Sequence, residues 1–600
     1  MLSQRKISSF FYIGFLLVVV VHSVLVLHFL PFKDVFSNKP IVTDDYPLHM
    51  YIYNLLTANP GFGLLRIYVK HFAAGAFLII FGEKFIELTL INQMTSFLDS
   101  VVLFKVYALF INLISIFLFY FCLKNFGLKR KALIYGMVLF LLAWDFSRFI
   151  HKTNYNGLLP FLYLIIIWLC SASSFYRYFE LRDTKFFYLG VVFSLIAALI
   201  HPYYLFSVLP LLLLLILFML SKRELLKGLI LFLLAAIFLV PPAIYVYYTN
   251  GIYAVPLFHN SYGFSQIKDT ILNYPFFFFF FLLGCCGLFF MKKNLRKYFL
   301  LFLILFIILG FFGYLTPLKF FQTQRFLYFA FFLLIIPSIE VLAKLRLNQK
   351  LLVVMIYIFY VTLFTTYSIS EVVSLKLSTT VPNSTRELID WIKTNTDKKG
   401  RILLEGSGYK SNHIYGGHYN AMFPLLVDRE FATSFYPYPI SDSKRFQFTE
   451  GKLYIPEYEN SLQIEKCSCS IIKNITDAFN VHWIIVWSDS SISKLSSCRQ
   501  FFDFYSNVSI FKIFVPKHTP NYFLTGNGTL LVNSSQIVLK CVTPYCVLKY
   551  CWHPKVNIPG ISTYPYQPIE GLTINFVKLN CSIIREGSKN YRYGFECDNS

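Results

Sequence analysis

Long apolar segments recur along the first 370 residues of the chain, and most are close to the length needed to cross a lipid bilayer. The first runs from Phe10 to Leu30. Ten more follow, at 102–123, 132–148, 157–176, 186–201, 203–220, 228–247, 273–291, 298–315, 326–343 and 351–370. The chain is 56% hydrophobic and 14% charged, a composition that a soluble protein could not carry without exposing apolar surface. The sequence therefore predicts a polytopic α-helical membrane protein with about eleven transmembrane helices.

Basic residues predict how these helices are oriented. Arg5 and Lys6 precede the first segment, which is long and has no small-residue cleavage site after it, so we interpret it as a retained helix rather than a signal peptide. Lys and Arg clusters follow the second, fourth, sixth, eighth and tenth segments, as the positive-inside rule requires of cytoplasmic loops. The net charge of +23 is thus a topology signal and does not indicate nucleic acid. A multi-pass protein of the cell membrane with a cytoplasmic N-terminus is expected.

The C-terminal region is polar and is predicted to lie outside the cytoplasm, because an odd number of helices places it there. It holds eight of the twelve cysteines, which suits disulfides in an oxidising compartment without revealing their pairing. The Asn-x-Ser/Thr glycosylation sequences of the chain fall in this region, at Asn383, Asn474, Asn507, Asn527, Asn533 and Asn580. We therefore predict a membrane domain over 1–370 and an extracytoplasmic domain over 371–600.

The extracytoplasmic domain is predicted to be α+β at first and β-rich later. A capping-box pattern at Ser384–Glu387 precedes a helical pattern. Strand patterns follow at Arg401–Leu404, His482–Trp487, Ser509–Val515, Thr529–Val532, Gln536–Val542 and Tyr545–Tyr550. The later strands are typical of a β-sandwich-like module.

The first external loop, residues 31–99, is unusually long and carries the best candidate for chemistry. Asp44 and Asp45 follow the first membrane helix, and a helix starting near Pro47 would place Asp45 and His49 on one face, with Tyr53 one turn further. The apolar run at 72–81 is too short to span a membrane and is interpreted as an interfacial helix. Loop acids beside a membrane can also be merely solvated, but the neighbouring histidine and the scarcity of acids in the membrane part favour a functional pair.

An acidic pair of this kind has two possible roles. It can hold a divalent cation such as Mg or Mn against a phosphate, or one carboxylate can accept a proton from an attacking hydroxyl. Further polar residues are predicted at the outer ends of membrane helices, namely His151, His201, Gln324 and Arg325. A guanidinium matches phosphate oxygens in charge and geometry, so Arg325 is a candidate for binding a phosphate, although anchoring at the membrane interface would also explain it.

In its architecture and its acidic stretch the chain resembles the GT-C superfamily of integral membrane glycosyltransferases. Asp44-Asp45 matches the acidic motif in the long first external loop of that family. Asp45-x-x-x-His49, Arg325-Phe326, Arg401–Glu405 and Val547–Pro554 also resemble uncharacterised membrane proteins labelled as related to 6-pyruvoyl-tetrahydropterin synthase. The chain lacks the Trp-Trp-Asp-Tyr-Gly motif of the oligosaccharyltransferase branch, so transfer of a whole oligosaccharide to asparagine is not expected.

The resemblance implies transfer of one sugar from a polyprenyl-phosphate donor to a glycan, lipid or protein acceptor outside the cytoplasm. Asp44 or Asp45 would act as the base or bind the metal, His49 would support them, and Arg325 would contact the donor phosphate. An inverting reaction is expected from a carboxylate base. Two alternatives remain: a transporter or flippase of lipid-linked glycans, which would need ionisable residues within the membrane helices, and a membrane-anchored surface binding protein.

Overall fold

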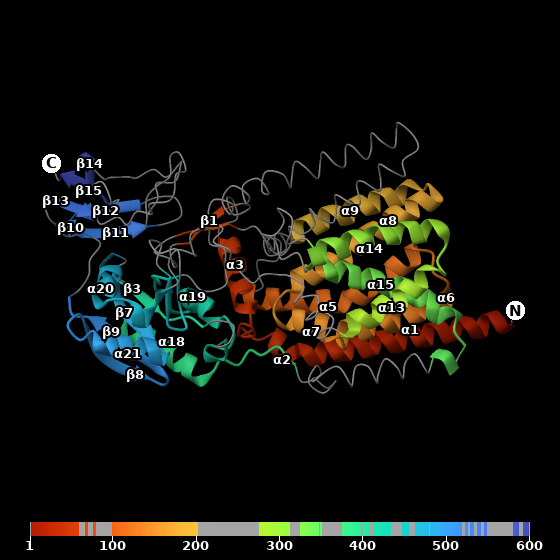
Figure 1. Cartoon of the computed structure of the whole chain (residues 1–600), viewed down its shortest axis with the longest axis horizontal. Coiled ribbons are helices and arrows are strands. Elements are labelled where there is room, and N and C mark those ends of the chain that lie inside the picture. Colours follow the sequence, from red (N-terminus) through yellow and green to blue (C-terminus); the bar gives the residue numbers. More distant parts are fainter. Residues whose placement is uncertain are drawn as a thin grey trace. The chain divides into compact units, whose positions relative to one another are not determined.

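The computed structural model places most of the membrane helices and most of the C-terminal region (Figure 1). The residues that it describes are 2–58, 66–69, 76–79, 99–201, 275–312, 325–346, 348–350, 375–397, 400–407, 412–433, 447–454, 462–478, 480–518, 523–525, 528–532, 537–541, 545–548, 580–586 and 592–598. The chain divides into two compact units. The membrane unit comprises Met1–Ile41 and Phe81–Ser378, and the tail unit comprises Val42–Ile80 and Thr379–Ser600.

The membrane unit is built from helices. Their bounds are α1 Leu2–Phe29, α2 Phe32–Val35, α5 Ser100–Asn125, α6 Arg130–Asp145, α7 Arg148–Tyr155, α8 Leu159–Leu181, α9 Thr184–Ile200, α13 Pro275–Leu288, α14 Lys293–Phe312 and α15 Phe326–Lys344. Eight of the predicted membrane segments coincide with helices of this set. The segments predicted at 203–220, 228–247 and 351–370 lie outside the described residues.

Five of the described helices are long and apolar enough to cross a membrane. They are Phe11–Phe29 within α1, Ser100–Asn125, Leu159–Leu181, Lys293–Phe312 and Phe326–Lys344. In α8, 94% of the apolar window is buried inside the protein, whereas in α1 the share is only 17%. A helix that is apolar all round and largely buried belongs at the centre of a bundle, and an exposed apolar one suits contact with lipid. The chain is therefore a helical membrane protein.

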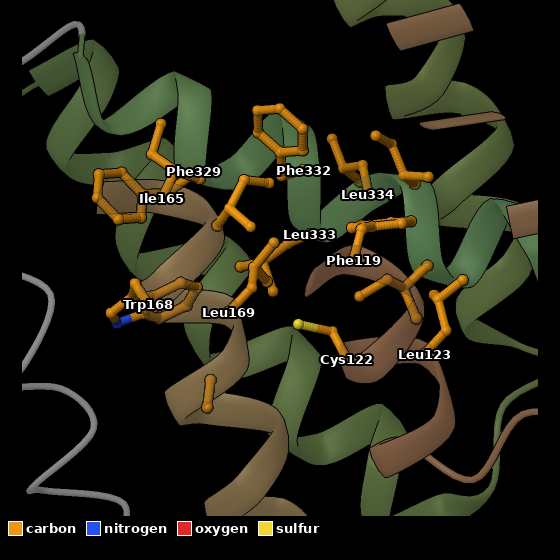
Figure 2. Close-up of a cluster of buried hydrophobic side chains, with 14 of the residues drawn as sticks. Phe119, Cys122, Leu123, Ile165, Trp168, Leu169, Phe329, Phe332, Leu333 and Leu334 are labelled. Carbon is orange, nitrogen blue, oxygen red and sulfur yellow. The ribbon is translucent and has the colours of Figure 1, made fainter. Parts of the chain in front are cut away.

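The core of the membrane unit is a continuous apolar cluster between α5, α8 and α15 (Figure 2). Phe119 and Cys122 of α5, Trp168 of α8 and Phe332 of α15 are all fully buried. Trp168 makes edge-to-face contacts with Phe302, Phe306 and Phe329, at ring-centroid distances of 5.2, 5.2 and 5.4 Å. Such aromatic pairs are favourable beyond the area that they bury. Close packing of this kind holds the central helices in fixed positions.

A buried lysine ties the segment after α1 to the start of α5. Lys105 is 0% exposed, and its ammonium donates to the backbone oxygens of Asp34 at 2.6 Å and Lys39 at 2.8 Å, and to the backbone oxygen of Ser37. A buried ammonium is tolerated only when its hydrogen bonds are satisfied. This arrangement fixes residues 34–39 against the start of α5.

The interfacial helix predicted over 72–81 is wrong. Residues Ala76–Ile79 form strand β2, which pairs antiparallel with β1, Arg66–Val69. Arg66 is opposite Ile79, and Val69 is opposite Ala76. The two segments are rich in β-branched and aromatic residues, which favour a strand, and Gly75 disfavours a helix at that point. A strand needs a neighbouring strand for its backbone hydrogen bonds, whereas a helix makes them within itself. Residues Arg66–Val69 supply that neighbour here.

The tail unit is a mixed α/β region. Its central sheet has the order β3-β7-β9-β8, with β3 Arg401–Leu404 parallel to β7 Val481–Val486, and β9 Phe511–Pro516 antiparallel to both β7 and β8 Phe502–Val508. Other helices and strands of the unit are α3 Tyr46–Ala58, α18 Asn383–Asn395, α19 Phe423–Val427, α20 Cys469–Ala478, α21 Asp489–Ser497, β4 Gln447–Thr449, β5 Lys452–Tyr454 and β6 Leu462–Gln463. The described residues of the unit also form the short 3-10 helices η4 Asn412–Ile414, η5 Tyr419–Met422 and η7 Ile464–Lys466.

The later strands form two small sheets. Strands β10 Phe523–Thr525, β13 Tyr545–Leu548, β15 Arg592–Asp598 and β14 Asn580–Glu586 make a four-stranded sheet in that order. Strands β11 Gly528–Val532 and β12 Ile537–Cys541 pair with each other. The strands predicted at Arg401–Leu404, His482–Trp487, Ser509–Val515, Thr529–Val532, Gln536–Val542 and Tyr545–Tyr550 are all present, with small shifts at their ends.

The capping box predicted at Ser384 is not formed. Helix α18 begins at Asn383, and its N-cap is Pro382, which makes no side-chain capping bond. Proline has a backbone angle suited to the entry of a helix and lacks the N–H that would need a partner there. Ser384 therefore lies in the first turn rather than at the cap, although the helix itself is as predicted.

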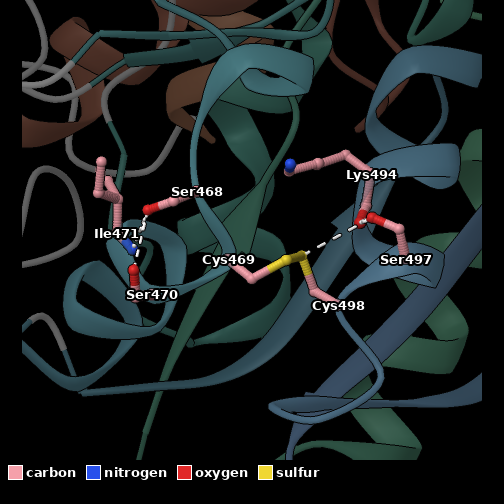
Figure 3. The surroundings of a disulfide bond; sticks show 7 residues. All are labelled: Ser468, Cys469, Ser470, Ile471, Lys494, Ser497 and Cys498. Carbon is pink, nitrogen blue, oxygen red and sulfur yellow. Dashed lines mark hydrogen bonds between the residues drawn. A yellow bond between two sulfur atoms is a disulfide. The ribbon is translucent and has the colours of Figure 1, made fainter.

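One disulfide links two helices of the tail unit (Figure 3). Cys469 at the start of α20 is bonded to Cys498 just after α21, across a sequence separation of 29 residues. The bond lies at the edge of an apolar cluster that includes Leu403, Ile484 and Phe514. A disulfide restricts the unfolded chain and so stabilises the folded one. Cys469 and Cys498, which are among the eight cysteines predicted to be available for oxidation, are thus paired.

Candidate functional site

Two carboxylates and an imidazole meet in the tail unit. The His418 side chain lies with Nε2 at 3.4 Å from Oδ1 of Asp45 and 3.8 Å from Oδ1 of Asp44. One ligand atom from each of the three residues falls within 4.8 Å of the others. The His418 side chain is 5% exposed, and those of Asp44 and Asp45 are 13% and 22% exposed. The acidic pair found in the sequence is thus part of a half-buried three-residue cluster.

Helix α3 fixes the position of the acids. The backbone oxygen of Asp45 accepts hydrogen bonds from the N–H groups of Leu48 and His49, each at 3.1 Å, so Asp45 is at the entry of the helix. Pro47 suits the first turn because its missing N–H would have no partner there. The helix predicted after Asp45 is therefore confirmed. Asp44 has a φ of +42°, a left-handed conformation that aspartate and asparagine tolerate better than most residues.

The histidine comes from a glycine loop that packs directly on the acids. The His418 N–H donates to the backbone oxygen of Asp44 at 2.9 Å. Gly416 and Gly417 both have a φ of +73°, which favours glycine. A Cβ atom on Gly417 would lie 2.4 Å from the Asp44 nitrogen and 2.8 Å from its Cα. Only a residue without a side chain allows the two backbones to approach this closely.

Replacing Gly417 with alanine is expected to separate His418 from the acids. The methyl group would clash with Asp44 and also strain the left-handed backbone, at a cost of about 1–3 kcal/mol. Thermal unfolding and Mn²⁺ affinity of the purified chain would show the loss. Gly406→Ala is the matched control, because its Cβ would have no neighbour nearer than 3.4 Å. Equal effects of the two substitutions would contradict the role of this close approach.

His49 is close enough to His418 to act on it electrostatically. It lies one turn along α3 from Asp45, is 1% exposed, and its proximity contributes to the pKa of His418. Tyr53 lies a further turn along the helix and is fully buried. The four-residue spacing between Asp45 and His49 therefore spans the first turn of α3, and a shared role of the two side chains remains a prediction.

The surroundings of His418 favour the neutral form of its imidazole. Burial and, to a smaller extent, the neighbouring His49 lower its pKa to about 4. The contacts with Asp44 and Asp45 are therefore contacts between carboxylates and a neutral ring rather than ion pairs. A neutral imidazole keeps a lone pair on one nitrogen, and that is the form in which histidine binds metals.

The three side chains fit a divalent cation. Metal–oxygen and metal–nitrogen bonds of about 2.0–2.2 Å leave neighbouring ligand atoms roughly 3–4 Å apart. The 3.4 and 3.8 Å separations are in that range. Two carboxylates with one imidazole form a mixed donor set that suits Mn²⁺ or Zn²⁺ better than Mg²⁺, which prefers oxygen alone. The residues present therefore match the predicted cofactor class.

Three of the residues predicted at the outer ends of membrane helices are described, and they form two groups in the membrane unit. The Arg325 guanidinium is 5.3 Å from the ring centroid of Phe161, and the His201 ring is 5.6 Å from that same ring. His151 lies elsewhere, in edge contact with Phe29 and lining a pocket with Asp145 and Asn154. Gln324 lies outside the described residues. Convergence of Arg325 with the acidic pair remains a prediction.

Sequence reasoning missed His418. It lies more than 370 positions from Asp44 in the chain, so no spacing rule connects them. The available signal was Gly416-Gly417 immediately before a histidine, because paired glycines mark a place where the backbone must turn or approach another segment closely.

The chain is similar to known glycosyltransferases in structure but not detectably in sequence. No protein-family model matches it, and no curated protein does either. It superposes on the oligosaccharyltransferase of Archaeoglobus fulgidus in its apo form with a TM-score of 0.52 and 11% identity, over 84% of this chain and 75% of that one. A mutant of the arabinofuranosyltransferase AftD from Mycobacteria gives a TM-score of 0.50 and 9% identity, over 87% and 43%. At such low identity the likeness is one of fold, and the fold is GT-C-like.

Proposed function

We propose that this chain is a membrane glycosyltransferase that moves a sugar from a polyprenyl-phosphate donor to a glycan, lipid or protein acceptor. The observation that carries the proposal is the convergence of Asp44, Asp45 and His418 in one half-buried cluster. The GT-C-like fold supports it, since two structures with this fold are an oligosaccharyltransferase and an arabinofuranosyltransferase. The extracytoplasmic face is proposed as the place of reaction from the distribution of basic residues.

The proposed reaction is a displacement at the anomeric carbon of the donor. One carboxylate of the pair accepts the proton of an acceptor hydroxyl, whose oxygen forms the new bond to that carbon. The bond from the carbon to the phosphate oxygen breaks, and the polyprenyl phosphate leaves with the electron pair. Attack from the side opposite the phosphate inverts the anomeric centre. A divalent cation held by the cluster would supply positive charge for the phosphate oxygens.

The other predicted residues have supporting roles in this proposal. His418 is proposed to keep the carboxylates in place, because its ring lies 3.4 and 3.8 Å from their oxygens, and the buried His49 is proposed to support this arrangement. Arg325 is proposed to bind the donor phosphate, and His201, His151, Gln324 and Tyr53 to line the substrate site. The closer resemblance to the membrane proteins labelled as pterin-synthase-related is a prediction from short motifs and adds no chemistry to the proposal.

A transport function is the second candidate, and one observation favours it. Nδ1 of His22, within the membrane helix α1, is 2.7 Å from Oδ2 of Asp145 in α6, and Nε2 is 2.9 Å from the backbone oxygen of Asn112. Both side chains of the His22–Asp145 pair are buried. Ionisable residues inside a membrane bundle often mark the path of a substrate or proton. A transporter of lipid-linked glycans would use this pair and would leave the acidic pair without a chemical role.

Reconstitution of the purified chain in lipid vesicles tests the proposal. The vesicles contain a set of polyprenyl-phosphate sugars, and release of polyprenyl phosphate is followed by mass spectrometry in the presence of Mn²⁺. Release with at least one donor, dependent on added acceptor, is expected. Movement of an intact donor between leaflets without bond breakage would instead establish the transporter.

A further inference from the structure

The hairpin formed by β8 and β9 brings an exposed aromatic ring and a glycosylation sequence onto one face of the sheet. Phe504 is opposite Phe514, and Asn507 is opposite Lys512. Residues directly opposite each other in an antiparallel pair share a face, and Lys512 and Phe514 are two residues apart on β9. Phe504 and Asn507 therefore lie on the same face, although three positions separate them in the chain.

A β-bulge makes this possible. The pairing shifts between Phe504 and Ser506, so that Tyr505 is an extra residue in the strand. The Tyr505 ring instead contacts Trp391 of α18 at 6.1 Å and Trp483 of β7 at 5.2 Å. Without the bulge, alternation along the strand would place Phe504 and Asn507 on opposite faces.

Side-chain contacts agree with the register. The Lys512 ammonium is 5.8 Å from the ring centroid of Phe504, and the Phe504 ring makes an edge contact with Phe514 at 5.8 Å. Phe504 is nevertheless 52% exposed, and Asn507 is exposed beside it. Phe504 and Asn507 follow each other along this face of β8, and their cross-strand partners Phe514 and Lys512 are two residues apart on β9, a separation of roughly 7 Å at the rise of a strand. One sugar ring attached to the asparagine would bridge that distance.

We propose that Asn507 carries an N-linked glycan whose first sugar packs on the exposed ring of Phe504. The Asn507 amide nitrogen gives a proton to a base of the host's oligosaccharyltransferase and forms a bond to the anomeric carbon of a lipid-linked oligosaccharide, whose phosphate leaves with the electron pair of the broken carbon–oxygen bond. The apolar C–H face of the sugar then covers the ring, which removes apolar surface from water. The contact between the sugar and the ring stabilises the β8–β9 hairpin. This proposal is independent of the transfer reaction proposed above.

The experiment uses the full chain produced in a secretory host that N-glycosylates. Mass spectrometry of the peptide that contains Asn507 measures occupancy, and hydrogen exchange measures protection of β8 and β9. Wild type is compared with Asn507→Gln, and the same comparison is repeated in chains carrying Phe504→Ala, Phe504→Tyr or Tyr505→Ala. Tyr505→Ala is the matched control, because it removes a neighbouring ring of equal exposure from the opposite face.

The glycan is expected to increase protection of the hairpin about two- to tenfold, the range of a single aromatic contact. The increase should disappear in Phe504→Ala, persist in Phe504→Tyr, and persist in Tyr505→Ala. An Asn507 peptide without sugar would overturn the proposal. The proposal would also be overturned if the glycan did not increase the protection of β8 and β9 in the wild-type chain. The same holds if the glycan increased that protection equally in Phe504→Ala.

Discussion

Replacing Asp45 with asparagine is expected to lower sugar transfer by about two to four orders of magnitude, the usual contribution of a positioned general base. Asparagine has nearly the same shape but cannot accept the proton of the acceptor hydroxyl. Asp44→Asn is expected to lower the rate of sugar transfer by a similar factor, because Asp44 is proposed to bind the metal or to act as the base. The measurement is the rate of polyprenyl phosphate release from the reconstituted chain.

The two substitutions are well suited to this question because asparagine tolerates the left-handed backbone of Asp44. A loss of activity would then reflect the missing charge rather than a strained loop. Asp390→Asn is the matched control, since Asp390 is an exposed acid on α18 of the same unit. Transfer at the wild-type rate in both Asp44→Asn and Asp45→Asn would exclude the proposed catalytic role.

Replacing Glu405 with alanine is expected to destabilise the tail unit by about 4 kcal/mol or more. The Glu405 carboxylate is fully buried at the end of β3. It accepts hydrogen bonds from the backbone N–H groups of Gly451 at 2.6 Å, Trp487 at 2.9 Å and Ser488 at 3.0 Å. The hydroxyls of Ser488 and Ser491 also donate to it, at 2.5 and 2.8 Å. Each buried donor left without a partner costs about 1–3 kcal/mol.

The loss would be measured by thermal unfolding or pulse proteolysis of the full chain in lipid nanodiscs. Glu465→Ala is the control, because Glu465 is an exposed acid in the same unit. A shift no larger than that of the control would show that the carboxylate is not required for folding. A large loss of stability in Glu405→Ala would also explain why the Arg401–Glu405 segment ends in an acid. Glu405 would then be needed for folding rather than for catalysis.

The sequence was most informative where one local pattern decides the structure. Long apolar segments predicted α5, α8 and α15, because a membrane-spanning helix satisfies its own backbone hydrogen bonds and needs no distant partner. Helix α3 after Asp45 and strand β3 at Arg401–Leu404 were predicted for similar reasons. These elements follow from residues within one or two turns of each other.

The errors arose where a distant segment decides the structure. Residues Ala76–Ile79 became a strand because Arg66–Val69 lies beside them to pair with, and periodicity in a ten-residue apolar run does not reveal such a partner. His418 joined the acidic pair through a glycine loop hundreds of residues away. The site was thus half predictable: the acids and His49 are local to one helix, whereas the third candidate ligand depends on the tertiary fold.

The central claim is that Asp44, Asp45 and His418 form one cation site, and pulsed electron paramagnetic resonance of bound Mn²⁺ tests it most directly. The full chain in nanodiscs is loaded with Mn²⁺, and coupling of the electron spin to a ¹⁴N nucleus is recorded for wild type and for His418→Gln. We expect a directly bonded nitrogen in wild type that is lost in His418→Gln, with weaker Mn²⁺ binding in Asp44→Asn and Asp45→Asn. No nitrogen coupling in wild type, or the same coupling in His418→Gln, would contradict the claim.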